Sequence, residues 1–320
     1  MDAPLHEDVA DAPKGGRAYW ATTSDGIRIR YAVWDGPKGY ALIYPGRTEY
    51  IEKYGQVICK LAERGIGCVT LDWRNQGLSD RQAKTGHVLD YSEYQRDIEC
   101  VLDRVDIGTP HLLSHSMGGL IALRSLQKKM PVKSAVFSAP MWGMGLPYPI
   151  RSTVKALAVG AKMLGFGTSK VIGTQRGSYI QNADPMDNSL VSDPRGAKWI
   201  QRQLNTHPEL ALGGPSWAWL NASHREINDL KSFPLPDCPT ITFLGSDETV
   251  VNPQATRDRA SGTGNGKLVI VNGAKHEVFM EAPQIQGVLW DELDALWKVD
   301  QEPSNTSAAS WTAGSPAAIT

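Results

Sequence analysis

The segment HLLSHSMGGL, residues 111–120, places a serine between an apolar run and a stretch of small residues. A nucleophilic serine on a sharp strand-to-helix turn has a strained backbone, so the residues two positions before and after it must be small. Here those residues are Ser114 and Gly118, whereas the usual GxSxG pattern has glycine at both positions. A helix that begins near Gly118 also directs its positive end at the serine, which favours an oxyanion there. The segment therefore predicts Ser116 as the nucleophile of an acyl transfer.

A serine attacks efficiently only when a histidine accepts its proton and an acid holds that histidine in the right tautomer. Of the seven histidines, His276 lies directly beyond the last apolar run, in NGAKHEVFMEAP, and it is the predicted base. The acid is expected after the run TITFLG, where Asp247 and Glu248 stand side by side. Spacing alone does not separate these two, and we expect one of them to reach the histidine while the other is solvated.

A tetrahedral intermediate also needs two backbone N–H donors for its oxyanion. One usually comes from the residue after the nucleophile, here Met117, and the other from the loop after an earlier strand. The run ALIYP ends in a turn, residues 45–49, in which Gly46 frees the backbone. The predicted oxyanion hole is therefore formed by the N–H groups of Arg47 and Met117, and the chemistry requires no metal ion or cofactor.

These residues must be positioned by a sheet, and the sequence carries the pattern of one. A hairpin is expected over residues 18–34, with its turn at Asp25-Gly26. Continuous apolar runs, typical of parallel strands buried on both faces, follow at 40–45, 67–73, 111–115, 134–140, 240–245 and 267–271. Amphipathic stretches at 52–64 and 91–105 predict helices between them. The expected fold class is α/β, with a mostly parallel, doubly wound sheet whose central third parallel strand leads into Ser116.

The longest interruption of this pattern lies between Pro140 and Asp237, where no convincing core strand occurs. Residues 141–237 are therefore predicted to be an inserted, mainly helical cap, in which Trp199, Trp217 and Trp219 supply apolar bulk above the sheet. The core is expected at 18–140 and 238–298, after a flexible N-terminal segment over 1–17. The tail 299–320 is rich in Ser, Ala, Thr and Pro and is predicted to be disordered, because it cannot bury enough apolar surface.

Composition narrows the function classes further. Hydrophobic residues make up 41% of the chain and the formal net charge is -1, so a large core can be buried and a nucleic-acid partner is not expected. The acidic start predicts no signal peptide, and no window approaches the roughly 18 apolar residues of a membrane span. The four cysteines lack metal-ligand spacing, which predicts free thiols in a reducing compartment, the cytoplasm: Cys59, Cys68, Cys100 and Cys238.

Together, several segments within residues 18–298 resemble the bacterial lysophospholipase and monoacylglycerol lipase branch of the α/β-hydrolases, which is also grouped with serine aminopeptidase-like proteins. The segments are PGRTEYIEKY, LDWRNQGLSDR, SHSMGG, LGSDETVVN and GAKHE. The resemblance implies that the acid sits three residues after the glycine of LGSDETVVN, which selects Glu248 over Asp247. The chain departs from the family pattern at Asn75, Ser114 and Asn252, where relatives carry glycine, glycine and aspartate.

The expected function is hydrolysis of a carboxylic ester through an acyl-enzyme, on a small-molecule or lipid substrate such as a lysophospholipid or monoglyceride bound beneath the cap. A haloalkane dehalogenase or epoxide hydrolase would have an aspartate in place of Ser116. An aminopeptidase remains an alternative and would use cap carboxylates to bind the substrate amine, the candidates being Glu209, Glu226 and Asp229. A non-catalytic binding protein with the same fold is the remaining alternative.

Overall fold

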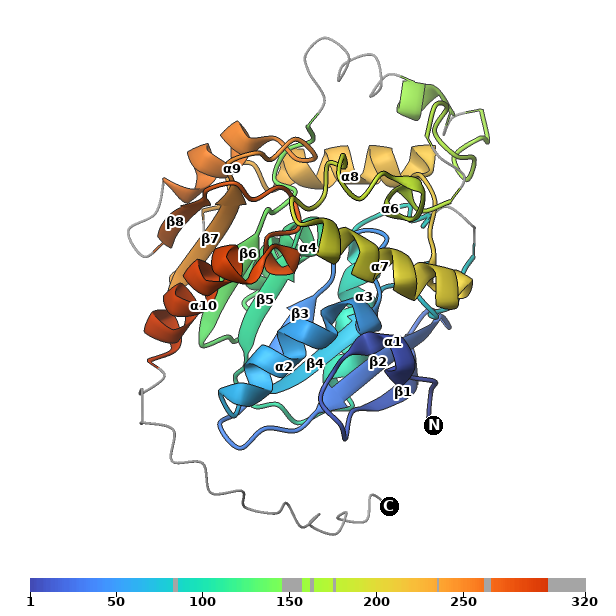
Figure 1. Ribbon diagram of the computed structural model, residues 1–320. Coiled ribbons are helices and arrows are strands. Elements are labelled where there is room, and N and C mark those ends of the chain that lie inside the picture. The colour runs from blue at the N-terminus through green and yellow to red at the C-terminus, as the bar shows by residue number, and fades with distance from the viewer. Residues whose placement is uncertain are drawn as a thin grey trace.

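A computed structural model describes residues 1–82, 86–145, 157–161, 164–174, 177–234, 236–261 and 266–298. An eight-stranded sheet with the order β1-β2-β4-β3-β5-β6-β7-β8 forms its centre (Figure 1). Its strands are β1 Arg17–Thr22, β2 Arg28–Trp34, β3 Tyr40–Tyr44, β4 Gly67–Asp72, β5 His111–His115, β6 Ser134–Ser138, β7 Thr240–Gly245 and β8 Gly266–Val271. The β1–β2 and β2–β4 pairs are antiparallel, and the pairs from β4 to β8 are parallel. The predicted hairpin and mostly parallel sheet are confirmed.

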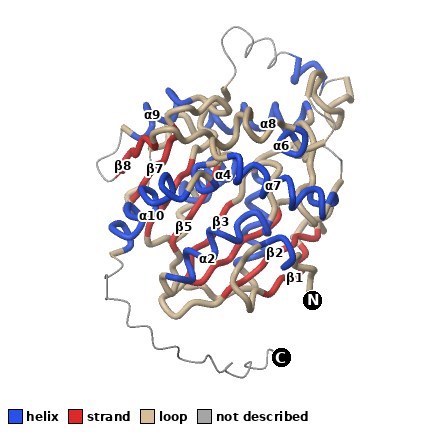
Figure 2. Tube along the Cα trace, viewed as in Figure 1, coloured by secondary structure: helices blue, strands red, loops and turns tan. Residues whose placement is uncertain are grey.

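Helices cover both faces of this sheet, as the buried character of its strands requires. On one face lie α2 (Gly55–Glu63) and α10 (Pro283–Trp297), and on the other lie α3 (Ser92–Leu102) and α4 (Met117–Gln127). Figure 2 shows α2 and α10 lying over the strands. A further helix, α9 (Pro253–Ala260), contacts β7 and β8. The helix predicted over 52–64 begins as a 3₁₀ turn, η1 (Ile51–Tyr54), before it continues as α2.

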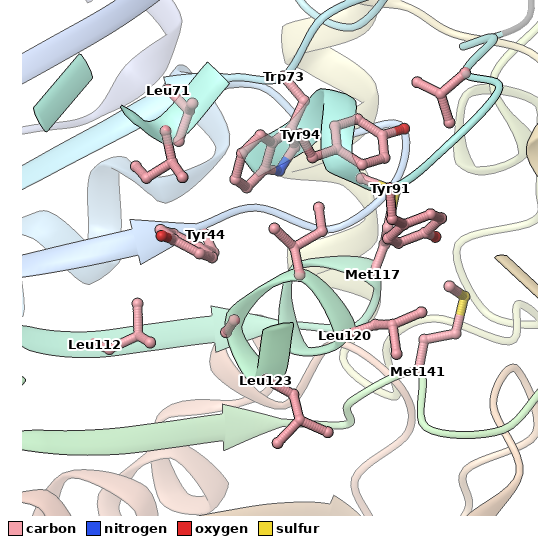
Figure 3. Close-up of a cluster of buried hydrophobic side chains, with 14 of the residues drawn as sticks. Tyr44, Leu71, Trp73, Tyr91, Tyr94, Leu112, Met117, Leu120, Leu123 and Met141 are labelled. Carbon is pink, nitrogen blue, oxygen red and sulfur yellow. The ribbon is translucent and has the colours of Figure 1, made fainter. Parts of the chain in front are cut away.

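The core around α4 is built on aromatic packing. The ring of Trp73 meets Tyr44 and Tyr94 edge to face, with centroid distances of 5.1 and 5.6 Å. Figure 3 shows these rings beside Met117 and Leu120 of α4. The indole N–H of Trp73 also donates to the carbonyl of Pro45 at 2.8 Å. This core therefore supports both the helix that follows Ser116 and the turn that contains Arg47.

The residues between β6 and β7 that the structure describes lie as helices and turns at the carboxyl end of the sheet. They include α6 (Tyr179–Asn182), α7 (Pro194–Thr206), the 3₁₀ turn η2 (Pro208–Leu210) and α8 (Trp217–Asp229). Asp193 and Ser216 cap the N-termini of α7 and α8 with their side chains. The apolar face of α7 packs with the core on the α2 side, and α8 packs with the core on the α4 side. The residues between β6 and β7 are thereby held on both cores.

The N-terminal residues differ from the sequence-based expectation of a flexible segment. A short helix, α1 (Glu7–Ala10), buries Val9 and Ala10, and α1 contacts η1 and α7. The N–H of Ala3 donates to the carbonyl of Ala18 and that of Trp20 to the carbonyl of Met1, both at 2.9 Å. The expectation for 1–17 is wrong because it rested on polar composition, which does not register backbone pairing with β1 or one buried apolar pair.

Two further expectations concern the chain as a whole. Across the described residues, no helix combines the length and apolar character that crossing a bilayer requires. The four cysteines are free thiols, with Cys68 and Cys100 buried and Cys59 and Cys238 half-buried. The tail 299–320, predicted to be disordered, lies outside the described residues.

Candidate active site

Ser116 lies at the junction between β5 and α4, in a strained backbone conformation with φ 50° and ψ −117°. The following helix passes so close to β3 that a Cβ on Gly118 would lie 2.1 Å from the carbonyl oxygen of Tyr44. Ser114, in contrast, fits at the position where the family has glycine, because its hydroxyl donates to the carbonyl of Val136 at 3.0 Å. The elbow therefore requires glycine after the serine and tolerates a second serine before it.

His276 connects Ser116 to Glu248. Its Nε2 lies 2.9 Å from Ser116 Oγ, and its Nδ1 lies 2.7 Å from Glu248 Oε2. A carboxylate can only accept, so Nδ1 carries a proton and Nε2 is the atom that can take the serine proton. All three side chains are buried, with 4 to 8% of each residue exposed. The three residues thus have the geometry in which a serine passes its proton to a histidine and a carboxylate stabilises the resulting imidazolium.

Glu248 is fixed by more than the histidine. Its second carboxylate oxygen accepts the N–H groups of Val250 and Val251, at 2.6 and 3.0 Å. Burial alone would raise the pKa of Glu248, but His276 and these two N–H donors hold it below the ordinary value. The carboxylate is therefore charged at neutral pH and able to stabilise an imidazolium.

Asp247, the alternative acid, points elsewhere. Asp247 is exposed, and its carboxylate accepts a hydrogen bond from Ser246 Oγ at 2.9 Å. Its backbone N–H donates to the carbonyl of Ala274. The structure thus brings Ser116, His276 and Glu248 together and leaves Asp247 outside the group.

The two expected oxyanion donors lie on either side of this group. Met117 is the first residue of α4, so its N–H is one of the donors that have no partner within their own helix. Arg47 lies in the turn after β3, and it lines the same pocket as Ser116. In this turn the N–H of Gly46 donates to Glu49, and the N–H of Thr48 donates to Gln76 at 2.5 Å. Side chains therefore hold the backbone on both sides of Arg47.

The side chain of Arg47 extends toward residues between β6 and β7. Its Nη2 donates to the carbonyl of Gly213 at 2.9 Å, and its guanidinium lies 5.0 Å from the ring centroid of Trp219. Burial lowers the pKa of Arg47 to about 10, so the group remains cationic at neutral pH. A turn that belongs to the sheet is in this way joined to the residues above it.

A cavity of about 660 Å³ opens at Ser116 and His276, and residues between β6 and β7 form part of its wall. Apolar side chains form much of its wall, among them Met141, Met144, Leu190, Leu212, Trp219 and Val250. Among the described residues, Arg47 is the only arginine or lysine in its lining. A cavity of this size and character suits an elongated apolar ligand with a polar end.

Sequence reasoning missed a group of buried charges next to His276, which we name the charge cluster: Glu49, Lys53, Tyr54, His115 and Glu277. The Lys53 ammonium donates to Glu49 and to Glu277, at 2.6 Å each. The Tyr54 hydroxyl donates to Glu49 at 2.6 Å, and His115 Nε2 lies 3.3 Å from Glu277. The spacing of Glu49 and Lys53 by four residues, and the position of Glu277 directly after His276, were the signals in the sequence.

Two groups of side chains in the described part of the chain have atoms close enough to hold a metal ion. One is Glu49, His115 and Glu277, and the other is His6, His207 and Glu209. In the first, the Lys53 ammonium already lies between the two carboxylates and supplies the positive charge. In the second, the two imidazole rings are stacked at 3.6 Å, nearly parallel, so their nitrogens do not aim at one common point.

The carboxylates considered for an aminopeptidase lie away from the cavity. Glu226 pairs with Arg124 at 2.7 Å, Glu209 contacts His207 at 3.2 Å, and Asp229 is exposed. None of the three belongs to the cavity lining in the described part of the chain. The carboxylates of Glu49 and Glu277 do border the cavity, but both already bind Lys53.

Comparison with known proteins adds three similarities. Residues 35–283 match the protein family described as serine aminopeptidase, S33. Lysophospholipase L2 of Escherichia coli K12 is 26% identical over 280 residues, which are 82% of this chain and 81% of that protein. The probable lysophospholipase L2 of Haemophilus influenzae is 28% identical over 252 residues, 77% of this chain and 79% of that protein.

Two solved structures have a similar fold. A monoglyceride lipase from Saccharomyces cerevisiae superposes with a TM-score of 0.70 at 18% identity, and covers 91% of this chain and 98% of its own. A monoacylglycerol lipase from Paleococcus ferrophilus has a TM-score of 0.67 at 20% identity, with 85% and 99% covered. At these identities the likeness concerns the arrangement of the elements.

Proposed function

Because the chain belongs to the serine aminopeptidase S33 family of the α/β-hydrolases, we propose that it is a serine hydrolase of carboxylic esters that acts on single-chain glycerolipids, either lysophospholipids or monoacylglycerols. The observation that carries the proposal is the contact chain from Ser116 through His276 to Glu248, at 2.9 and 2.7 Å. Ser116 and His276 line an apolar cavity. The lysophospholipases among its relatives support the choice of substrate.

In the proposed mechanism, His276 Nε2 takes the proton of Ser116 while the serine oxygen attacks the ester carbonyl. The N–H groups of Arg47 and Met117 stabilise the oxyanion, and the positive end of α4 adds to their field. The imidazolium, stabilised by Glu248, then protonates the leaving alcohol. A water molecule, deprotonated by His276, hydrolyses the acyl-enzyme and frees Ser116.

The cavity wall is the basis for the substrate. An acyl chain would lie against its apolar side chains, and the cationic Arg47 would face an anionic or strongly polar head group. The aminopeptidase alternative is less favoured, because the cap carboxylates lie away from the cavity and the two at its edge bind Lys53. We propose that residues 18–140 and 238–298 form the catalytic unit and that 141–237 cap it. Free thiols support a cytoplasmic location.

Labelling with a fluorophosphonate probe tests the reaction class. The folded wild-type protein should label, and Ser116→Ala should not. Ser138→Ala is the matched control, because Ser138 is also a buried serine at the end of a central strand and should leave labelling intact. Labelling of Ser116→Ala at the wild-type rate, or no labelling of the wild type, would contradict the proposal.

A substrate panel tests the substrate class separately. Lysophospholipids, monoacylglycerols, short p-nitrophenyl esters and aminoacyl amides should be compared by kcat/KM. We expect the two glycerolipids to exceed the amides by at least about a hundredfold, a difference of about 2.7 kcal/mol in transition-state binding. Preference for the amides would favour the aminopeptidase alternative, and the balance between the two lipids would identify the head group.

A further inference from the structure

We propose that the charge cluster sets the protonation equilibrium of His276, so that Glu277, His115 and Lys53 are positioning residues for the base. This inference rests on the proposed function, in which His276 is the base. It concerns side chains that touch neither the nucleophile nor the acid in the contacts described above. Four observations carry it.

The first observation is where the charge cluster lies. Glu49 is the last residue of the turn 45–49, which contains Arg47, and its carboxylate accepts the N–H of Gly46, while His115 directly precedes Ser116 in the chain. Glu277 directly follows His276. The charge cluster therefore joins the three backbone segments that carry the oxyanion turn, the nucleophile and the base.

The second observation is its charge balance. Burial alone would lower the pKa of His115, but Glu277 and Glu49 raise it above the ordinary value. His115 Nδ1 faces the carbonyl of Ser138 at 3.1 Å and Nε2 faces Glu277, so both nitrogens meet acceptors, as an imidazolium requires. The charge cluster then contains two carboxylates and two cations, and it is neutral.

The third observation is the short distance to the base. The ring centroids of His115 and His276 are 4.8 Å apart, and the charge of His276 is one of the causes that lower the pKa of Glu277. Every member of the charge cluster is at most 6% exposed, so water screens these charges poorly. Removing one charge should therefore change how readily His276 accepts a proton.

The fourth observation is the set of groups that face His276 in the described part of the chain. Ser116 faces it from β5 and α4, Glu248 from the loop after β7, and His115 from the end of β5. Glu277 lies on its own segment. Lys53, Tyr54 and Glu49 stand behind Glu277 and His115. Since the contacts to Ser116 and Glu248 are separate from the charge cluster, the two sets can be changed independently.

The test uses variants that change the cluster charge in opposite directions. Glu277→Gln removes a negative charge, and this removal should disfavour the protonated form of His276. The acid limb, which is the fall of kcat/KM at low pH, should therefore move down by about one pH unit. In this variant His115 should still be protonated at the pH of the acid limb, because the carboxylate of Glu49 lies 3.6 Å from its Nε2. Lys53→Met and His115→Gln each remove a positive charge and should move the same limb up by about one pH unit.

Histidine NMR titration of His276 in the full-length variants gives a second readout that needs no turnover. It should show shifts of the same sign as the kinetic limb. If the wild type hydrolyses no ester, the proposed function fails, whereas the titration still tests the charge cluster. Shifts of equal sign in Glu277→Gln and Lys53→Met, or no shift in either, would overturn the inference, because a merely structural role predicts no dependence on the sign of the charge.

A double variant protects the test against loss of folding. Breaking a buried ion pair at one partner is strongly destabilising, whereas removing both partners is less so. Lys53→Met combined with Glu277→Gln leaves Glu49 facing His115, and its acid limb should return to within about 0.3 pH units of the wild type. The surface pair Lys267 and Glu292, 2.5 Å apart, is the matched control. The double variant of Lys267 and Glu292 should leave the acid limb unchanged. An acid limb that is displaced in both double variants would also overturn the inference.

Discussion

Two histidines lie side by side at the carboxyl end of the sheet, and each faces a buried glutamate. His276 meets Glu248 through Nδ1, and its Nε2 meets the Ser116 hydroxyl. His115 meets Glu277 through Nε2, and its Nδ1 meets a backbone carbonyl. A hydroxyl can donate a proton whereas a carbonyl cannot, so the first pair leaves a basic nitrogen available and the second does not. In the proposed mechanism the same two residue types thus form a base in one place and a cation in the other.

The largest expected effect separates the two histidines directly. His276→Gln should lower kcat by about 10⁶-fold, because the serine then has no group to take its proton. His115→Gln should lower kcat by tenfold or less on the plateau of the pH profile, above its own acid limb. Steady-state kinetics on the best ester of the panel measures both. Equal losses in the two variants would mean that His115 takes part in the chemistry.

The next effect compares the two adjacent acids. Glu248→Gln should lower kcat by about 10³ to 10⁴-fold, since the amide no longer fixes the tautomer or stabilises the imidazolium. Asp247→Asn should change kcat by less than about twofold. Among the described residues, the Asp247 carboxylate has a hydrogen bond only with Ser246. The ratio of the two kcat values measures the assignment. A larger loss in Asp247→Asn would reassign the acid.

A smaller effect concerns stability. The pKa of His115 in the folded protein is raised above its ordinary value of 6.5, so the folded state holds a proton that the unfolded state releases first. Its stabilisation is complete below that ordinary value and is lost as pH rises through the folded pKa, with a slope of at most ~1.4 kcal/mol per pH unit. Urea denaturation between pH 6 and 9 should show this loss in the wild type. The loss should be absent in His115→Gln. If the free energy of unfolding changed with pH in the same way in both proteins, this prediction would be wrong.

The smallest effect tests the partner of His115. Ser138 Oγ lies 3.4 Å from His115 Nδ1, further than the Ser138 carbonyl at 3.1 Å, so the hydroxyl contributes little. Ser138→Ala should change the free energy of unfolding by less than about 1 kcal/mol and leave the acid limb in place. Thermal denaturation and the pH profile measure these two quantities. A shifted limb would show that the hydroxyl, like that of Ser116, matters to its histidine.

Much of the sheet could be predicted from the sequence, because strands buried on both faces leave continuous apolar runs. The runs at 111–115 and 240–245 coincide with β5 and β7 residue for residue. The pattern also predicted the turn geometry around Ser116. The departures from the family have local explanations: Asn75 has φ 64°, which asparagine tolerates better than most residues, and Asn252 caps α9 with its side chain.

Contacts that depend on distant residues could not be predicted in the same way. Spacing left Asp247 and Glu248 open, because the direction of a loop side chain depends on its backbone, and only the resemblance favoured one of them. The charge cluster was missed because Glu49, His115 and Glu277 are far apart in the sequence. Their types alone suggest solvated surface charges, and only the fold places them around one ammonium.

The N-terminal segment described above holds α7 in addition to the packing of α7 on the core of the α2 side. Asp11 binds Trp199 and Arg202 of α7, and Gln203 donates to the carbonyl of Val9. Lifting α7 from the sheet therefore breaks contacts made by the first residues of the chain, even though these lie far from Ser116 in the sequence. Because opening either place breaks the contacts of the other, we expect amide protons of α7 and of the N-terminal residues to exchange with solvent at similar rates.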